Sequence, residues 1–195
     1  MAVRFRHGAY PDKKIMKGMD QIIMELKKLT EQTLEMFDAK DTKELIKKIS
    51  ENYNNHESME RFCELINNDL NVDWLQKIYQ YYEADRKNKG QDYTPQSLAS
   101  LMASLTLLNG DNKVVDMCAG SGALTIATWR INKNIQPTCI EFDENVIPIL
   151  VFNLALRNIQ AVVKHEDVLS REVFETYEIT KGEKFGEVVR HDSID

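Results

Sequence analysis

The sequence of 195 residues lacks the features that define several large classes of protein. Its longest apolar run is far shorter than the ~18 residues that a membrane span needs. Residues 1–14 are polar and basic, without the apolar stretch of a secretory signal. A hydrophobic content of 43% also excludes a disordered or collagen-like chain. We therefore expect a globular protein without a membrane partner, built as one large domain or two small ones.

Cysteine is scarce, and positive charge is in deficit. The three cysteines, Cys63, Cys118 and Cys139, form no C-x-x-C pair, which argues against a disulfide framework and against a zinc site. We expect no metal and a cytoplasmic location, where thiols stay reduced. The net charge of −6 excludes a wholly basic coat for nucleic acid, although it leaves room for a local basic surface.

Two hydrophobic patterns divide the chain near residue 90. Residues 1–90 carry apolar side chains at helical spacing and predict an N-terminal domain of four amphipathic helices. Three expected N-caps precede these helices: Asp41, Asn55 and Asn71. Residues 91–195 predict a second domain in which strands and helices alternate, typical of an α/β fold with a parallel, doubly wound sheet. Its expected strands are residues 113–117, 138–142 and 161–164, with a candidate fourth at 185–189, and its expected helices are residues 95–108, 123–131 and 144–157.

The strongest local motif runs from Asp116 to Gly122, where a strand ends in an acid and a turn of small residues leads into a helix. Ligands of doubly wound sheets bind at the carboxyl ends of strands, and Gly120 and Gly122 would let a ligand approach the backbone. A dinucleotide-binding loop would need a third glycine where Thr125 stands. Asp116 would also repel a pyrophosphate. It suits a cationic ligand such as S-adenosylmethionine (SAM), which carries an ammonium and a sulfonium.

An acid ends the next strand as well. Glu141 lies 19 residues after Gly122, close to the ~20-residue spacing at which an acid accepts hydrogen bonds from ribose hydroxyls. Asp143 is an alternative for this function, although we expect it to cap the following helix.

A third acidic position follows the strand at 161–164. There Asp167 could accept from an adenine amino group, with Phe142 or Val168 packed on the ring. Taken alone, Glu166 and Asp167 would instead be cap or loop charges.

The first helix of this half begins at Tyr93-Thr94-Pro95, where we expect Thr94 as N-cap and Pro95 as the first helical residue. A helix N-terminus offers free N–H groups and a positive dipole, which suit a carboxylate such as the methionine end of SAM. Taken alone, this is an ordinary helix start.

Together and in this order, the motifs resemble the SAM-binding half of the adenine-N6 DNA methyltransferases, above all modification subunits of type I restriction-modification systems and related N-6 DNA methylases. The resemblance covers about residues 74–170 and implies a Rossmann-like SAM-dependent methyltransferase fold. It implies SAM as cofactor and DNA as partner, with methyl transfer to N6 of an adenine flipped out of the duplex. The implied SAM contacts are Tyr93, Thr94 and Pro95 for the methionine end, Asp116, Gly120 and Gly122 for the amino-acid and sulfonium region, Glu141 for the ribose and Asp167 for the adenine.

One family motif is absent from the sequence. Members place an Asn or Asp, two prolines and an aromatic after the fourth strand, where these residues bind the flipped adenine. This chain has four prolines and no Pro-Pro pair, and we expect residues 190–195 to form a polar tail. We therefore assign no catalytic residue and expect the isolated chain to be inactive.

The missing motif and the missing later strands leave three hypotheses. The chain is a truncated or split DNA methyltransferase completed by a partner, a non-catalytic SAM-binding or regulatory protein, or a methyltransferase for RNA or a small molecule. An unfilled sheet edge after the third or fourth strand predicts a partner subunit or a homo-oligomer, because exposed edges pair readily.

Overall fold

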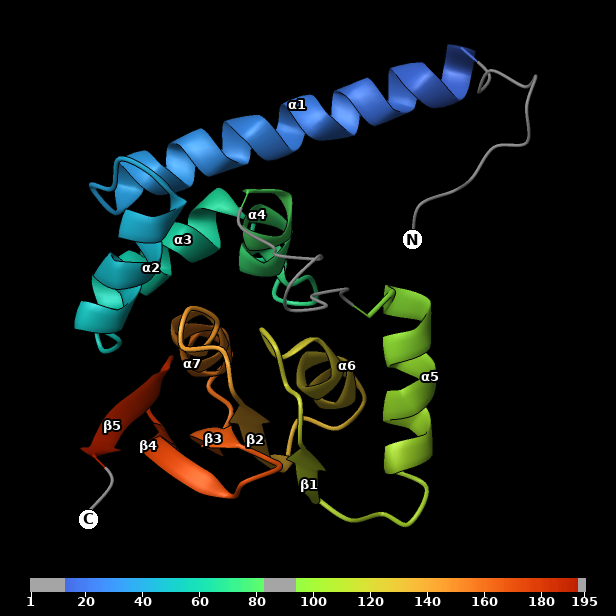
Figure 1. Cartoon of the computed structure of the whole chain (residues 1–195). Helices are drawn as coiled ribbons and strands as arrows, with labels where there is room; N and C mark the ends of the chain where they lie inside the picture. The colour runs from blue at the N-terminus through green and yellow to red at the C-terminus, as the bar shows by residue number, and fades with distance from the viewer. Residues whose placement is uncertain (1–12, 83–93, 193–195) are drawn as a thin grey trace.

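The computed structural model describes residues 13–82 and 94–192, with the backbone alone for residues 13–23 and 81–82. Figure 1 shows the helices α1 (Lys13–Met36), α2 (Thr42–Glu51), α3 (His56–Leu65), α4 (Trp74–Tyr82), α5 (Gln96–Thr106), α6 (Ala123–Ile131) and α7 (Ile147–Leu156). The strands are β1 (Lys113–Asp116), β2 (Gln136–Glu141), β3 (Ala161–Asp167), β4 (Glu172–Lys181) and β5 (Gly186–Asp192). The α/β class and the four helices expected before residue 90 are confirmed.

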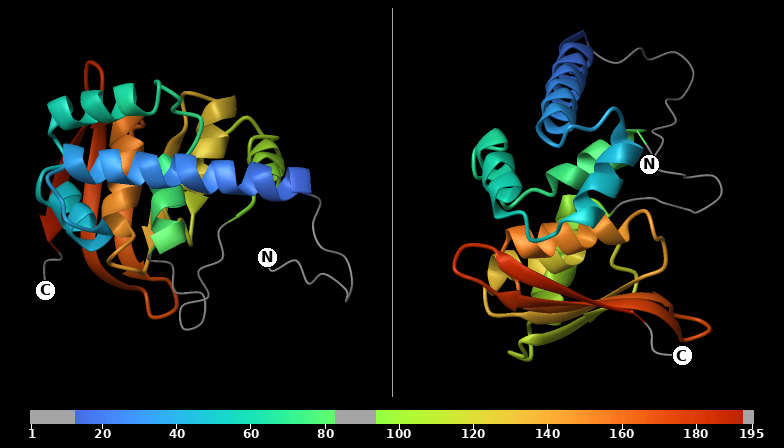
Figure 2. Two further views of the ribbon diagram at one scale, coloured as in Figure 1. Left: turned by 90° about the horizontal axis from the view of Figure 1, so that it is seen from above. Right: turned by 90° about the vertical axis from the view of Figure 1, so that its left-hand side faces the viewer.

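The five strands form one sheet whose spatial order follows the chain, β1-β2-β3-β4-β5. β1, β2 and β3 pair in parallel, with α6 and α7 as crossovers, whereas β4 pairs antiparallel with both β3 and β5. The prediction of a parallel sheet is therefore wrong for β4 and β5. Only residues 168–171 join β3 to β4, and a parallel connection needs about a dozen residues or more. The prediction of a doubly wound sheet, which has helices on both faces, is also wrong for the described residues, whose helices lie on one side (Figure 2, right).

The last strand was placed correctly but was predicted too short. Residues 190–192 continue β5 and are not a polar tail, since Asp192 is the register partner of Glu175 on β4. The predicted open edge does not lie after the third expected strand, because β4 pairs with β3 there. The fourth expected strand is β5, and it does lie at a sheet edge. Within residues 13–82 and 94–192 the two sheet edges are β1 and β5.

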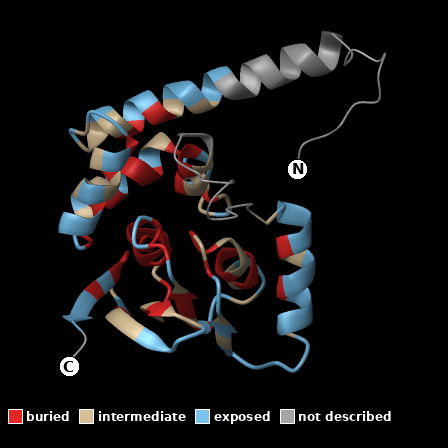
Figure 3. Cartoon of the chain, viewed as in Figure 1, coloured by how far each residue is buried: buried red, intermediate tan, exposed pale blue. Residues whose placement is uncertain are grey.

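The helices lie in layers on one side of the sheet. All ten residues of α7 are buried, and α7 lies between the sheet and the layer formed by α2, α3 and α4 (Figure 2, right; Figure 3). The larger of two apolar clusters in the described residues includes Leu45 and Phe62 from the first half and Phe152 and Val163 from the second. The smaller one joins α5 and α6 and consists of Ala99, Ala103 and Ala127. The division into two domains near residue 90 stays a prediction.

Two of the three expected N-caps, Asp41 and Asn55, are confirmed. Asp41 accepts from the N–H of Glu44 at 2.8 Å, and Asn55 accepts from the N–H of Ser58 at 3.0 Å. Asn71 is wrong, because its own N–H donates to Asp69 in a turn. Asp73 caps α4 instead and accepts from the N–H of Gln76 at 2.8 Å.

A membrane span is not found in the part of the chain that the structure describes. None of the helices there is both long and apolar enough to cross a bilayer.

Candidate functional site

The carboxyl end of β1 carries Asp116, as the sequence predicted. Its Oδ2 accepts a hydrogen bond from Oγ1 of Thr125 on α6 at 3.0 Å. Burial is the main cause that raises the pKa of the Asp116 carboxyl above its ordinary value of 3.8, and the negative charge of Glu141 adds to it. The site therefore holds a carboxylate whose charge lacks full solvation and would be stabilised by a cation.

The structure brings Glu141 to the same place. Its Oε2 accepts from the N–H of Gly120 at 2.8 Å, while Oε1 accepts from the N–H groups of Phe142 at 2.9 Å and of Asp143 at 2.8 Å. One carboxylate thus fixes both the glycine loop after β1 and the turn after β2. A second bond, from Ala119 N–H to Ile140 O at 2.9 Å, also ties the loop to β2.

Gly120 and Gly122 both adopt the left-handed backbone region, with φ of +54° and +99°. A Cβ atom at Gly120 would meet nothing within 4 Å, so the space over this residue is open to a ligand. A Cβ atom at Gly122 would lie 3.0 Å from Cδ1 of Leu150 on α7. Gly120 therefore provides access, and Gly122 provides close packing of the loop.

Asp143 does not cap α7 as expected. The helix begins three residues beyond the predicted start of 144, after Val146, and Oδ1 of Asp143 accepts instead from the N–H of Asn145 at 3.2 Å. Asp143 closes the turn between β2 and α7, which leaves Glu141 as the acid at the strand end.

Asp167 ends β3, two residues beyond His165, the register partner of Glu141. Its Oδ1 accepts from the N–H groups of Leu169 at 2.9 Å and Ser170 at 3.4 Å. The bond from Leu169 is the main cause that lowers the pKa of Asp167 below 3.8. Asp167 is therefore a turn charge, and its contact with adenine stays a prediction.

An aromatic cluster lies beside Glu141 and consists of Phe142, His165 and Phe174. Phe142 is 60% exposed, and its ring centroid is 6.4 Å from that of Phe174. His165 is 4.7 Å from the Phe174 ring, and its Nε2 is 3.0 Å from the carbonyl oxygen of Phe142. This arrangement holds an exposed apolar ring next to the strand-end acid.

The start of α5 at Thr94 and Pro95 lies next to α6, the helix that follows the glycine loop. Tyr93 lies outside the described residues. The N-cap of α5 is Pro95, without a side-chain bond, so the prediction that Thr94 caps the helix is wrong by one residue. Thr94 and Pro95 line a cavity of about 380 Å³ together with Ala123, the residue after Gly122, and with side chains of α4. Asp116, Glu141 and Asp167 do not line this cavity.

A family model now accounts for these motifs, since the model described as "N-6 DNA Methylase" matches residues 71–190. The chain belongs to the N-6 DNA methylase family. The match confirms the resemblance and extends it at both ends, from before α4 to within β5.

This N-6 DNA methylase was also compared with solved structures and with curated proteins. A solved structure, the methyltransferase subunit of a type I restriction-modification system from Streptococcus thermophilus, is similar with 16% sequence identity and a TM-score of 0.43. The similarity covers 84% of this chain and 46% of that one, so the chain spans about half the length of that subunit. The search of curated proteins found no match.

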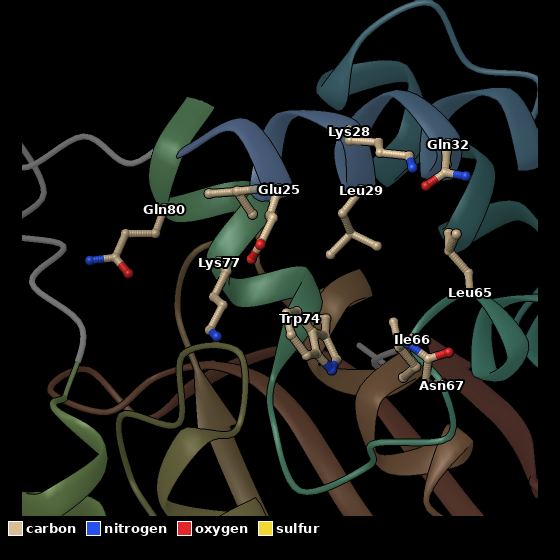
Figure 4. Close-up of a pocket in the computed structure, with 11 residues that line it drawn as sticks. Glu25, Lys28, Leu29, Gln32, Leu65, Ile66, Asn67, Trp74, Lys77 and Gln80 are labelled. Atoms are coloured by element: carbon tan, nitrogen blue, oxygen red, sulfur yellow. The ribbon is translucent and has the colours of Figure 1, made fainter. Parts of the chain in front are cut away.

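A second cavity of this N-6 DNA methylase lies between α1 and α4. It has a volume of about 670 Å³ and is lined by apolar side chains such as Leu29 and Ile66 together with Trp74 (Figure 4). Nζ of Lys77 lies 4.4 Å from the centre of the Trp74 ring. None of the predicted cofactor residues lines this cavity, so it is separate from the strand-end site.

Sequence reasoning missed the supporting residues of the site. Thr125 was noted only as the residue that breaks a dinucleotide motif, yet it is the hydrogen-bond donor to Asp116. Asn153 donates from Nδ2 to Ser121 O of the glycine loop at 3.0 Å. The sequence could have predicted a buried hydrogen-bond partner for Asn153, because a polar side chain inside an otherwise apolar helix needs one.

Proposed function

We propose that the chain binds SAM at the carboxyl ends of β1 and β2 and acts, in the cytoplasm, in methyl transfer to N6 of adenine in DNA, as in restriction-modification. One observation supports this most: Glu141 accepts a hydrogen bond from Gly120, which joins the two predicted acids and the open glycine loop in a single site. Family membership supports the cofactor, since N-6 DNA methylases generally use SAM.

Each residue of this site would take one part of SAM. The ammonium would sit beside Asp116, where a cation offsets the poor solvation of the carboxylate. The open face of Gly120 would receive the chain near the sulfonium, with Gly122 holding the loop in place. Oε2 of Glu141 accepts one N–H and Oε1 accepts two, so Oε2 has capacity left for a ribose hydroxyl.

The two ends of the cofactor would lie on either side of these residues. The first N–H groups of α5, after Thr94 and Pro95, would donate to the methionine carboxylate, together with Tyr93. The exposed ring of Phe142 would pack on the adenine. The turn of Asp167 uses Oδ1, so Oδ2 is the oxygen that would accept from the adenine amino group.

Methyl transfer also needs a group that binds the target adenine. We propose that the Asn/Asp-Pro-Pro-aromatic motif supplies it from outside these 195 residues, on a partner chain or on a further C-terminal part of the same protein. The attacking N6 nitrogen would take the methyl group from the sulfonium and then lose a proton. His191 and Asp192 do not replace this motif. Asp192 lies three strands from Glu141, about 14 Å at the usual strand spacing.

The partner would dock at the β1 edge of the sheet. In the described part of the chain β1 has β2 as its single strand neighbour, and Val115 is 64% exposed. α5 stands beside this edge (Figure 1). Large apolar side chains of α5 and of the segment that follows it are exposed: Leu98, Leu101, Met102, Leu105 and Leu108. Unpaired backbone groups next to an apolar surface favour addition of a strand from another chain.

Calorimetry tests the proposed cofactor site. Wild-type protein is expected to bind SAM and its demethylated product, and Asp116→Ala to weaken binding roughly 10- to 100-fold, the loss of one hydrogen bond to a charged group. Asp111→Ala, an exposed aspartate in the turn before β1, is the matched control and should bind as wild type does. Absence of binding by the wild type, or equal affinity of Asp116→Ala, would refute the proposal.

A second candidate is a SAM-binding protein that performs no methyl transfer. Transfer of a labelled methyl group to adenine-containing DNA, with and without candidate partner chains, separates the two candidates. RNA and small amines as competitors test the remaining acceptor classes.

A further inference from the structure

A buried polar network joins α7 to the chain segment before α4. Asn153 on α7 and Arg157, the C-cap residue of that helix, lie one turn apart, and both are buried. Arg157 donates from Nε to Leu70 O at 2.8 Å and from Nη2 to Val72 O at 2.9 Å. Its Nη1 donates to Asn153 O at 2.8 Å. One guanidinium thus holds two backbone carbonyls of the segment before α4.

Asp73 is the acidic member of this network and is 8% exposed. Its Oδ1 accepts from Nδ2 of Asn153 at 2.9 Å and from the N–H of Gln76 at the start of α4. Burial raises the pKa of Asp73, and the charge of Arg157 opposes this shift. Burying two opposite charges is costly, and an apolar pair of similar volume is often as stable. Stability alone therefore does not account for these groups.

The network reaches the glycine loop through the side-chain amide of Asn153 and through the side chain of Ser121, whose hydrogen bonding to Asp73 lowers the pKa of that carboxyl. Nδ2 of Asn153, which donates to Asp73, also donates to Ser121 O at 3.0 Å. Ser121 is buried between Gly120 and Gly122, the two loop residues in the left-handed region. The amide has two N–H groups, and these two acceptors use both.

The same segment approaches the start of α5. Asp73 and Gln76 line the cavity of about 380 Å³ that also contains Thr94, Pro95 and Ala123. The N-terminus of α4 is therefore connected with two parts of the candidate site, the glycine loop and the start of α5.

We propose that Asp73 is a positioning residue of the cofactor site, which fixes the Ser121 carbonyl through Asn153 and thereby sets the backbone of Gly120 and Gly122. This inference rests on the proposed SAM site. It makes the start of α4 a part of the cofactor-binding unit. Loops that bind cofactors need such support, because a displacement of about 1 Å can cost two orders of magnitude in function.

The test compares substitutions in the network with a substitution of similar cost elsewhere in the core. Asn153→Leu removes the two bonds that the amide donates and the one that it accepts from Nη1 of Arg157. Ile78→Val removes one buried methyl group from α4, outside the network. Asp73→Ala removes the acceptor, and Asp73→Asn keeps an oxygen for Asn153 and for the cap. Should Asn153→Leu fail to fold, Asn153→Ser is the second variant, since its hydroxyl is too short to bridge Asp73 and Ser121.

Two readouts are measured on the chain of 195 residues. In ¹H–¹⁵N NMR without SAM, the amide signals of Gly120 and Gly122 should shift in Asn153→Leu and Asp73→Ala, but stay in place in Ile78→Val and Asp73→Asn. In calorimetry the first two variants should bind SAM about tenfold more weakly, and the other two within about twofold of the wild type.

The outcomes separate the two proposals. Unmoved glycine signals in Asn153→Leu and Asp73→Ala, or equal losses in Ile78→Val, would overturn the positioning function of Asp73. Failure of the wild type to bind SAM would overturn the proposed function, while the glycine signals would still decide whether Asp73 sets the loop.

Discussion

Asp116 is partly buried, and its carboxylate accepts hydrogen bonds from the Thr125 hydroxyl and from the backbone of Cys118. Thr125→Val keeps the shape of the side chain and removes the donor. We predict a loss of about 1–2 kcal/mol in the free energy of unfolding, measured with urea, because a partly buried carboxylate loses one of the hydrogen bonds that it accepts. Thr180→Val, at an exposed position on β4, is the control and should be close to neutral. An equally neutral Thr125→Val would show that this bond contributes nothing.

The pKa of Asp116 gives cofactor binding a pH dependence. The pKa of Asp116 is raised above 3.8 in the folded protein, so folding favours the protonated carboxyl. The stabilisation of the fold by this group is therefore present in full below pH 3.8 and is lost as the pH rises through the folded-state pKa. Binding of the SAM ammonium needs the ionised carboxylate of Asp116. The affinity for SAM therefore rises with pH over the range in which this stabilisation of the fold is lost. We predict that SAM affinity, measured by calorimetry, falls as the pH is lowered toward this pKa, at higher pH than for an ordinary aspartate.

Asp116→Asn is the control for this pH dependence. It should bind SAM more weakly at neutral pH and lose most of the dependence. A wild-type affinity that is constant across the range in which the protein stays folded would contradict the assignment of the ammonium to Asp116.

Among the elements, β5 shows how a sheet edge is protected. The side-chain amide of Asn54, in the turn between α2 and α3, accepts from Val188 N–H at 2.8 Å and donates to Val188 O at 3.0 Å. This amide pairs with β5 as another strand would. β1 has no such cover among the residues that the structure describes, which is why we place the partner there.

Asn54→Ala removes both of these bonds from the β5 edge. We predict a loss of about 1–3 kcal/mol in the free energy of unfolding and more self-association, seen by sedimentation, because the edge becomes available for pairing. Asn52→Ala, an exposed asparagine at the end of α2, should change neither quantity. A monomeric Asn54→Ala of unchanged stability would show that the edge needs no cover.

The elements also show what the sequence could and could not reveal. The strands and helices from residue 113 to residue 164 follow clear patterns and were predicted within a few residues. β4 was missed, because Glu172–Lys181 carries charges at both ends and its inward side chains are few: Tyr177 and Ile179 are its buried apolar residues. Without β4, residues 185–189 had no antiparallel neighbour, and the sheet was predicted to be parallel.

The sequence predicted the parts of the candidate site that lie at the carboxyl ends of strands, where acids and glycines stand at a characteristic spacing. Asp116, Gly120 and Glu141 are close in space because parallel strands bring their carboxyl ends together. The bonds of Thr125 and Asp73 depend on how helices pack on the sheet, and local spacing carries no information on that packing.

At the scale of the whole molecule, the exposed apolar surface of α5 is the proposed docking site of a partner chain. Leu101→Gln and Leu105→Gln replace exposed side chains, so we predict unchanged stability and unchanged SAM binding. Association with a partner chain that carries the Asn/Asp-Pro-Pro-aromatic motif should be lost, as measured by pull-down and by labelled methyl transfer to DNA.

Leu169→Gln is the matched control for this surface, since Leu169 is 96% exposed in the turn between β3 and β4, remote from β1 in the sheet order. It should leave association intact. Methyl transfer by the isolated wild-type chain would contradict the need for a partner.

The central claim is that Asp116, Gly120 and Glu141 form one cofactor site, and a crystal structure with the demethylated product of SAM tests it most directly. We predict ribose hydroxyls on Glu141, the ammonium beside Asp116 and the ligand chain over the open face of Gly120. A ligand bound elsewhere, for example in the cavity beneath α1, with the carboxylates of Asp116 and Glu141 untouched, would contradict the account.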